Sequence, residues 1–222
     1  MDSQLVKTAR NILAMSCGLI AAMVDEIASA QPTPTPSQTT ITASFGNNVP
    51  ITIPSVGAGT PYPSTVNVNG LSGTILQTVV KLNSFNHSFP NDVDVLLVGP
   101  IGQKVLLMSD VGGGNPVSVV YLTLSDGATA FLPQTAALVS GTFKPTDYAI
   151  GAADTFPAPA PPAPYGNLLS SFNAQSPNGT WSLYVVDDGS GDLGSFAGGW
   201  RLTITTSSGA GSGAPIISDI GD

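Results

Sequence analysis

The sequence predicts an all-β domain, a sandwich or a barrel, and three observations lead to that expectation. No helical period of useful length appears after residue 30, whereas short β-branched runs recur, separated by Gly, Pro, Asn and Asp. Glycine and proline contribute 25 and 19 of the 222 residues, enough to close many turns. Because 42% of the residues are hydrophobic, the chain can bury a sizeable core, and one domain with flanking segments accounts for its length.

These runs define the expected strands. The clearest lie at 74–85, 92–98, 104–109, 117–124, 180–186 and 200–206, and weaker candidates lie at 41–45, 49–53 and 65–68. Trp181 begins an alternation of apolar residues along one side of its strand, and Trp200 begins an equivalent one. Both tryptophans are therefore expected in the core rather than as sugar-stacking platforms, since each can bury about 150–250 Å².

Two further segments have a predictable place. Residues 93–98 are apolar on both faces towards their end, so this strand is expected at the centre of a sheet. Residues 154–165 are rich in proline, which removes ladder donors, so they are expected to cross the surface as an extended loop.

The ends of the chain have a different composition from the middle. Lys7 and Arg10 precede an apolar run that is too short to span a bilayer, and a small-x-small site ends at Ala30, so residues 1–30 are expected to be a helical signal peptide. Residues 31–40 are expected to be a Pro/Thr-rich linker, 41–207 the β-domain and 208–222 a Gly/Ser-rich tail. Two alternatives stay open: an amphipathic N-terminal helix that remains attached, and lipoprotein processing at Cys17.

Charge and cysteine content narrow the function classes. Six Lys and Arg against fourteen Asp and Glu give a formal net charge of −8, which argues against nucleic-acid binding because phosphates require clustered basic side chains. Cleavage of the leader would remove the single cysteine, and with it disulfides and thiol chemistry. We expect a secreted, extracellular or cell-envelope protein with no stable membrane span after cleavage.

Three blocks of the sequence carry a family resemblance. The first is His87-Ser88-Phe89-Pro90-Asn91-Asp92-Val93 with the Gly-Pro-x-Gly turn at 99–102, the second is the return strand at 104–109, and the third is 178–187 (NGTWSLYVVD) with Trp200 and the strand after it. Together they resemble a P domain (P/Homo B domain), the β module that follows the catalytic domain of subtilisin-like proprotein convertases, in a bacterial extracellular variant. The resemblance departs at Val93, where the family usually has leucine, and no subtilisin-like catalytic domain precedes the module.

The resemblance implies a jelly-roll β-sandwich of the galactose-binding-domain-like kind without a catalytic site of its own. It implies an extracellular module that stabilises or binds, and its expected partner is an unidentified extracellular protein or a protease. Two alternatives remain: a regulatory module of a subtilisin-like serine endopeptidase that acts in proteolysis, and a carbohydrate-binding module. A glycan ligand requires exposed aromatic rings, for which Tyr62, Tyr121, Tyr148 and Tyr165 are the candidates.

Aspartates are the candidate metal ligands. Three of them flank glycines in the loop 187–194, and three others lie near the ends of strands that can meet it; the six are Asp187, Asp92, Asp94, Asp110, Asp188 and Asp192. Calcium prefers six to eight oxygen ligands, so a calcium site is expected here, although Asp and Gly also favour turns without any ion. Asp187 is the strongest candidate because it continues the inward side that Trp181 begins, and a buried carboxylate needs a partner.

His87 is the only histidine, and a catalytic role would need it to form a dyad with Ser88, Asp92 or Asp94. The chain has no Gly-x-Ser-x-Gly elbow. We therefore expect no catalytic residue and no cofactor other than Ca²⁺, with His87 as a hydrogen-bonded residue at a strand end that supports the loop 91–94.

Overall fold

The computed structural model describes residues 38–148 and 154–208. The predicted leader, most of the predicted linker and all of the predicted tail except its first residue lie outside them. Within the described residues the chain is all-β, apart from the two 3-10 helices η1 (Pro90–Asp92) and η2 (Leu169–Phe172). None of the helices in this part of the chain has the length and hydrophobicity of a membrane span.

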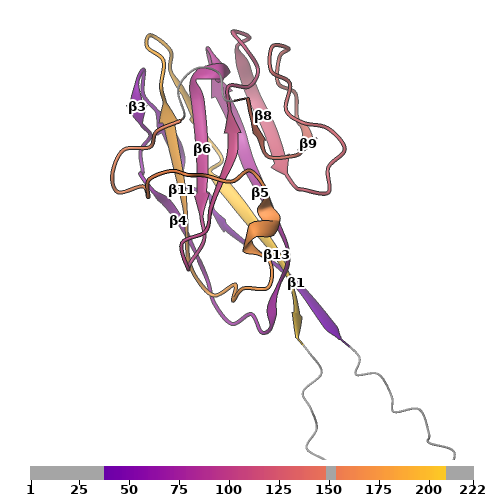
Figure 1. Cartoon of the computed structure of the whole chain (residues 1–222). Coiled ribbons are helices and arrows are strands. Elements are labelled where there is room, and N and C mark those ends of the chain that lie inside the picture. The colour runs from indigo at the N-terminus through magenta and orange to yellow at the C-terminus, as the bar shows by residue number, and fades with distance from the viewer. Residues whose placement is uncertain (1–37, 149–153, 209–222) are drawn as a thin grey trace, which may run out of the picture. The chain divides into compact units, whose positions relative to one another are not determined.

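The first of two mixed sheets, here the β5 sheet, is built around the longest strand (Figure 1). Its order is β1 (Thr39–Asn47), β13 (Trp200–Ser208), β5 (Thr74–His87), β12 (Gly194–Phe196) and β2 (Ile51–Ile53). The strand β8 (Val117–Leu124) pairs with β5 as well, and β9 (Gly141–Phe143) runs parallel to β8.

The second sheet, here the β6 sheet, has the predicted strand 93–98 at its centre. Its order is β10 (Thr146–Asp147), β7 (Lys104–Ser109), β6 (Val93–Val98), β11 (Gly179–Asp187) and β3 (Gly57–Ala58), and β4 (Ser64–Val68) also pairs with β11. Five of the six residues of β6 are buried. The central position predicted from a strand that is apolar on both faces is therefore confirmed.

Inward side chains of both sheets form one core. Trp181 of β11 and Trp200 of β13 are completely buried, as the alternation predicts. Each indole finds a hydrogen-bond acceptor: Trp181 Nε1 donates to the carbonyl of Pro177 at 3.0 Å, and Trp200 Nε1 donates to Ser64 Oγ at 3.0 Å. Because a buried indole N–H needs such a partner, these contacts also fix the orientation of the rings.

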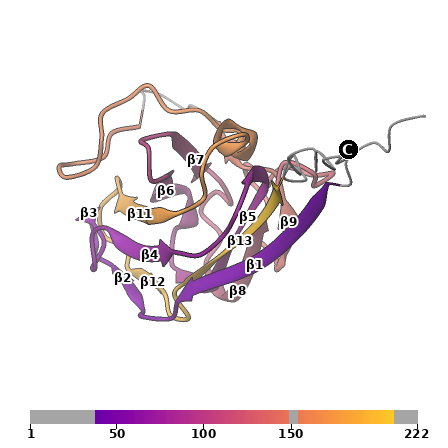
Figure 2. The same ribbon diagram turned by 90° about the horizontal axis from the view of Figure 1, so that it is seen from below.

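A second, smaller apolar cluster lies on the outer side of the β6 sheet. Residues 156–165, here the proline strap, pass over this side (Figure 2), and Phe156 packs with Leu96, Leu106 and Tyr184. The strap contains no strand, which agrees with the predicted loop. However, Phe156 is buried and Pro157 to Ala160 close a turn through Ala160 N and Pro157 O, so the segment covers the sheet rather than only crossing the surface.

Every strand predicted from the sequence is present with shifts of a few residues at its ends. Two ends differ notably: β1 begins at Thr39, inside the predicted linker, and Asp92 closes η1 before β6 begins at Val93. The sequence did not reveal β3, β9, β10 and β12, which are only two or three residues long. Such short strands have no measurable period, so only their neighbours in the sheet define them.

Candidate functional site: the acidic end of the sheets

Strand pairing brings the candidate aspartates to one end of the β6 sheet. Val93 at the start of β6 pairs with Asp187 at the end of β11, and Val95 pairs with Met108 near the end of β7. The loops after β7 and β11 therefore meet the start of β6. Asp188 N donates to the carbonyl of Asp92 at 2.9 Å, which joins two of these segments directly.

Asp187 and His87 form a buried pair between the sheets. Asp187 is completely buried, and its Oδ2 lies 3.0 Å from Nε2 of His87, whose side chain is equally inaccessible. Burial raises the pKa of Asp187, and the neighbouring His87 lowers it in part. Phe89 N donates to Nδ1 of His87 at 3.2 Å, so Nδ1 is an acceptor, whereas the contact between Nε2 and Asp187 Oδ2 does not have the geometry of a hydrogen bond.

The fit around this pair is tight. Gly194 stands opposite His87 in the register of β12 and β5, and a Cβ atom at Gly194 would run into the His87 ring and the carbonyl of Asn86. A Cβ atom at Gly189 would likewise run into the carboxylate of Asp92. Close packing therefore requires a glycine at 194, and at 189 the Asp92 side chain would have to move. Gly191 has open space around it, and its φ of +102° is what favours glycine there.

Asp94 lies on the opposite face of β6 from the core, beneath the loops at the same end. It is 3% exposed, and burial, followed by the charges of Asp154 and Asp188, raises its pKa to about 8. A hydrogen bond with Ser109 lowers the pKa in part. At neutral pH most Asp94 side chains are consequently protonated, which is the usual response of a carboxylate that is buried without a cation.

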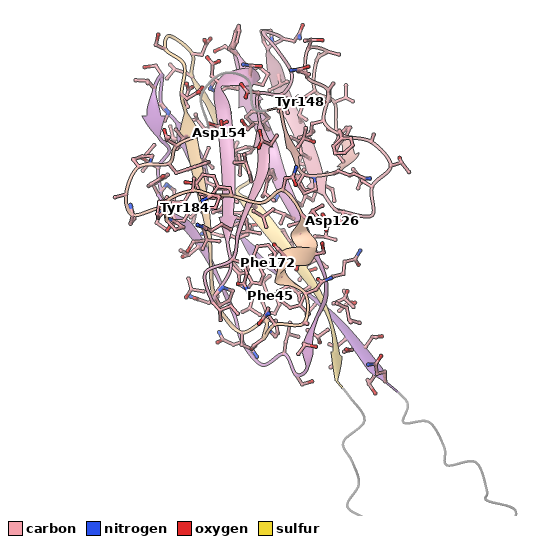
Figure 3. All side chains as sticks on the ribbon, in the orientation of Figure 1. Phe45, Asp126, Tyr148, Asp154, Phe172 and Tyr184 are labelled. Atoms are coloured by element: carbon pink, nitrogen blue, oxygen red, sulfur yellow. The ribbon has the colours of Figure 1, made fainter. Side chains whose placement is uncertain are left out.

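Other carboxylates at this end show the same direction. Burial first, and neighbouring aspartates second, raise the pKa of Asp92; burial and Asp110 raise that of Asp188. Asp154 is not among the residues predicted from the sequence, and its pKa is raised by burial and by Asp147, Asp110 and Asp188. Figure 3 shows Asp154 at the end of the domain that also holds Tyr148, away from Phe45. No local sequence pattern identifies Asp154, because it comes near Asp94 only in the folded chain, just before the proline strap begins.

The six predicted ligands thus gather at one end without forming a ready metal site. Asp110 receives a hydrogen bond from Ser109 Oγ at 3.4 Å, and the charge of Asp192 is close enough to raise the pKa of Asp92. Among the side chains of residues 38–148 and 154–208, no three His, Cys, Asp or Glu are arranged to hold a metal ion. The aspartates with raised pKa values can retain their protons, and a bound cation would offset the repulsion between the ionised carboxylates.

Three of the four candidate tyrosines for glycan binding are engaged within the protein. The hydroxyls of Tyr62 and Tyr165 donate to the carbonyls of Pro157 and Pro161 in the proline strap, and that of Tyr148 donates to Leu132 O. Tyr121, which is 41% exposed and lies under the Lys81 ammonium, is the most exposed of the four, and the other three are half-buried. The other three rings pack against the protein itself.

Comparisons with known proteins give no family for this chain. No protein-family model matches it, and the search of curated proteins finds no match. Among solved structures, the serine protease of Aeromonas sobria in complex with its chaperone shares 13% identity and a TM-score of 0.38, covering 79% of this chain and 28% of that one. The serine protease of Aeromonas sobria alone shares 14% identity and a TM-score of 0.38, covering 78% of this chain and 28% of its own. The chain thus spans little more than a quarter of these structures, and the likeness is too distant to carry an argument.

Proposed function

We propose that this chain is an exported, non-catalytic module resembling a P domain, a jelly-roll β-sandwich that stabilises or binds a partner protein. The observation that carries the proposal is the role of the residues that share the resemblance. Trp181 and Trp200 are buried in the core, and Gly102 closes its turn with a hydrogen bond to Gly99 O and a φ of +92°. These residues pack the core and close a turn, which supports a structural rather than a catalytic role for the positions that carry the resemblance.

The surroundings of His87 support the absence of catalysis. In a serine-type triad one ring nitrogen contacts the acid and the other contacts the serine hydroxyl. Here Nε2 faces Asp187, and Nδ1 is occupied by the backbone N–H of Phe89. Ser88 Oγ instead accepts a hydrogen bond from Leu193 N at 3.2 Å. Neither ring nitrogen is left to activate a nucleophile.

The direct test is a protease assay of the purified chain on a fluorogenic peptide library. We expect no hydrolysis, and His87→Ala is expected to change stability but no activity. Hydrolysis that disappears in His87→Ala would overturn the proposal.

The regulatory alternative is tested by co-purification with a subtilisin-like protease encoded beside the gene. A raised melting temperature of that protease in the mixture supports this alternative, and the absence of a complex contradicts it.

Calcium support is a second part of the proposal. A divalent cation at the acidic end would replace the protons on Asp94 and its neighbours, after the carboxylates turn towards a common point. A ligand at 100 times its Kd adds roughly 2.7 kcal/mol to stability, so the melting temperature should rise clearly in millimolar Ca²⁺ and fall in EDTA. Asp94→Asn should reduce the rise, whereas Asp126→Asn, which changes a carboxylate outside the predicted ligand set, should leave it intact. An identical melting temperature in Ca²⁺ and EDTA would remove calcium from the proposal.

A further inference from the structure

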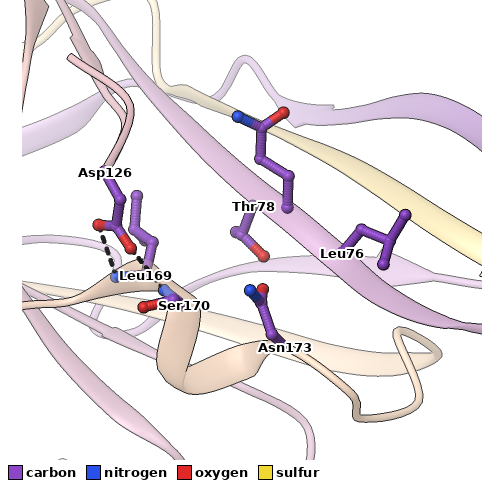
Figure 4. A pocket seen from close by; sticks show the side chains of 7 residues that line it. Leu76, Thr78, Asp126, Leu169, Ser170 and Asn173 are labelled. Carbon is purple, nitrogen blue, oxygen red and sulfur yellow. Dashed lines mark hydrogen bonds between the residues drawn. The ribbon is translucent and has the colours of Figure 1, made fainter.

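Two adjoining cavities lie where the η2 segment packs beside β5 and the loop around residue 126. The first has a volume of about 260 Å³ and is lined by Leu76, Gln77, Thr78, Asp126, Leu169, Ser170 and Asn173 (Figure 4). The second has about 180 Å³ and is lined by Asp126, Phe131, Lys144, Pro145, Asn167 and Leu168. Asp126 belongs to both. Each is smaller than the roughly 300–1,000 Å³ of pockets for drug-sized ligands, so each fits a single small ring.

The first cavity contains two buried oxygen atoms without a hydrogen-bond partner. Thr78 is 2% exposed and its Oγ1 has no partner, and neither does the buried Oδ1 of Asn173. Figure 4 shows both side chains at the cavity, Thr78 from the strand and Asn173 from the segment after η2. Buried polar atoms almost always have a partner, and leaving one unsatisfied costs about 1–3 kcal/mol. Two such atoms lining one cavity point to a ligand that supplies the missing partners.

Strand β5 is irregular at the same place. Thr206 of β13 pairs with Ile75 and Thr205 pairs with Gln77, so Leu76 is an extra residue in β5. This bulge leaves Leu76 44% exposed at the cavity. Bulges are common beside binding sites because they redirect a side chain. Here the bulge turns an apolar side chain towards the polar groups of the cavity.

Charge and chemistry define the ligand class. None of the residues that line the first cavity is basic, and Asp126 is held there by Leu169 N and Ser170 N at 2.9 and 2.7 Å, so an anionic ligand is disfavoured. A ligand that is both a hydrogen-bond donor and acceptor satisfies the Thr78 hydroxyl and the Asn173 carbonyl oxygen together. It also needs apolar faces for Leu76 and Leu169.

We propose that these cavities bind a neutral glycan, with one sugar ring against Thr78 and Asn173 and the next ring towards Phe131. Sugar rings carry hydroxyl groups at their edges and C–H groups on their faces, which matches this lining. Phe131 is 56% exposed, with the Lys144 ammonium 5.3 Å from its ring centre, and it offers the aromatic face that the engaged tyrosines do not. The inference deepens the proposed binding role by naming a ligand class.

The first experiment is an NMR titration of the full chain with glucose, galactose, mannose, N-acetylglucosamine and β-linked disaccharides of glucose and of N-acetylglucosamine. At least one sugar is expected to shift the amide signals of residues 76–78, 126 and 169–173, and a disaccharide to shift those near Phe131 as well. No shift with any of these sugars overturns the proposal. A shift of the same amides by an unstructured peptide but by no sugar also overturns it and assigns the cavities to peptides.

The second experiment uses two matched variants. Thr78→Val and Thr206→Val each remove a buried hydroxyl that has no partner, so both variants should fold, but only Thr78 lines the cavity. Thr78→Val should weaken sugar binding roughly two- to tenfold, the worth of one hydrogen bond, and Thr206→Val should leave it unchanged. Equal affinities in both variants contradict the assignment. Neither result bears on the protease mixture above, so failure of the glycan site and failure of the partner role are distinguishable.

Discussion

The outer faces of the two sheets differ, although both sheets contribute to the same core. On the β6 sheet the outer face is apolar, and Leu96, Leu106 and Tyr184 lie beneath the proline strap. On the β5 sheet the outer face is polar and carries hydroxyl pairs across the strands, such as Thr42 with Thr205 at 2.9 Å and Ser44 with Thr203 at 2.8 Å. Where strands are apolar on both faces, another segment has to cover the second face.

Proline suits the strap for a physical reason. Proline has no backbone N–H, so a proline-rich segment can cover an apolar face without many unpaired donors, and only its carbonyls need partners. Side chains from the sheet and its neighbours supply them: Tyr62 and Tyr184 donate to Pro157 O and Pro159 O at 3.0 and 3.4 Å, and Lys104 donates to Pro162 O at 2.6 Å. The strap is thus held by its backbone oxygens.

The largest expected effect comes from the covered face. Leu96→Ala removes a completely buried side chain and should lower the free energy of unfolding by about 2–5 kcal/mol, because it leaves a cavity under the strap. Thr203→Ala on the bare face of the β5 sheet should change it by about 0.5 kcal/mol or less. Urea unfolding of both variants measures the difference. Equal losses would mean that the strap does not seal the second face.

The next effect depends on pH and concerns Asp94, which also lies on the covered side. Its pKa is raised from 3.8 to about 8, so the folded protein keeps this proton while the unfolded chain loses it. The contribution of this proton to the free energy of unfolding is therefore fully present below about pH 4. It decreases by up to about 1.4 kcal/mol per pH unit as the pH rises towards 8. Asp94→Asn should remove this loss.

Thermal unfolding of Asp94→Asn and the parent chain between pH 4 and pH 9 tests this expectation. The variant should be more stable by a few kcal/mol at pH 8 and equal to the parent at pH 4. Thr203→Ala, which leaves every carboxylate in place, serves as the control and should keep the pH dependence of the parent. Parallel curves for Asp94→Asn and the parent would show that Asp94 is ionised in the folded state at neutral pH.

The smallest effect separates a tyrosine under the strap from one on the bare face. Tyr62→Phe removes the hydrogen bond to Pro157 O and should cost about 1 kcal/mol of stability. Tyr121 is exposed, so Tyr121→Phe should cost about 0.5 kcal/mol or less. Denaturant midpoints at constant slope give both values. If Tyr121→Phe costs as much as Tyr62→Phe, the strap is not held by these hydroxyl groups.

Part of this architecture was predictable because it depends on local alternation. The alternation that begins at Trp181 fixes which side of β11 is buried, and the same alternation placed Asp187 inside. The two apolar faces of 93–98 fixed a central strand. A buried Asp187 predicts a partner, but the sequence pattern places His87 only in support of the loop 91–94.

Other features required contacts between distant segments. His87 and Asp187 are 100 residues apart in the sequence, and Asp154, just before the strap, comes near Asp94 only in the folded chain. No sequence pattern distinguishes Thr78 and Asn173 from other polar residues. That their side-chain oxygens have no hydrogen-bond partner is a property of the folded chain alone. Sequence by itself determined which face of each main strand is buried, because side-chain alternation is a property of one strand. The tertiary structure decided which charges and unsatisfied oxygens meet, because burial and proximity are properties of several segments at once.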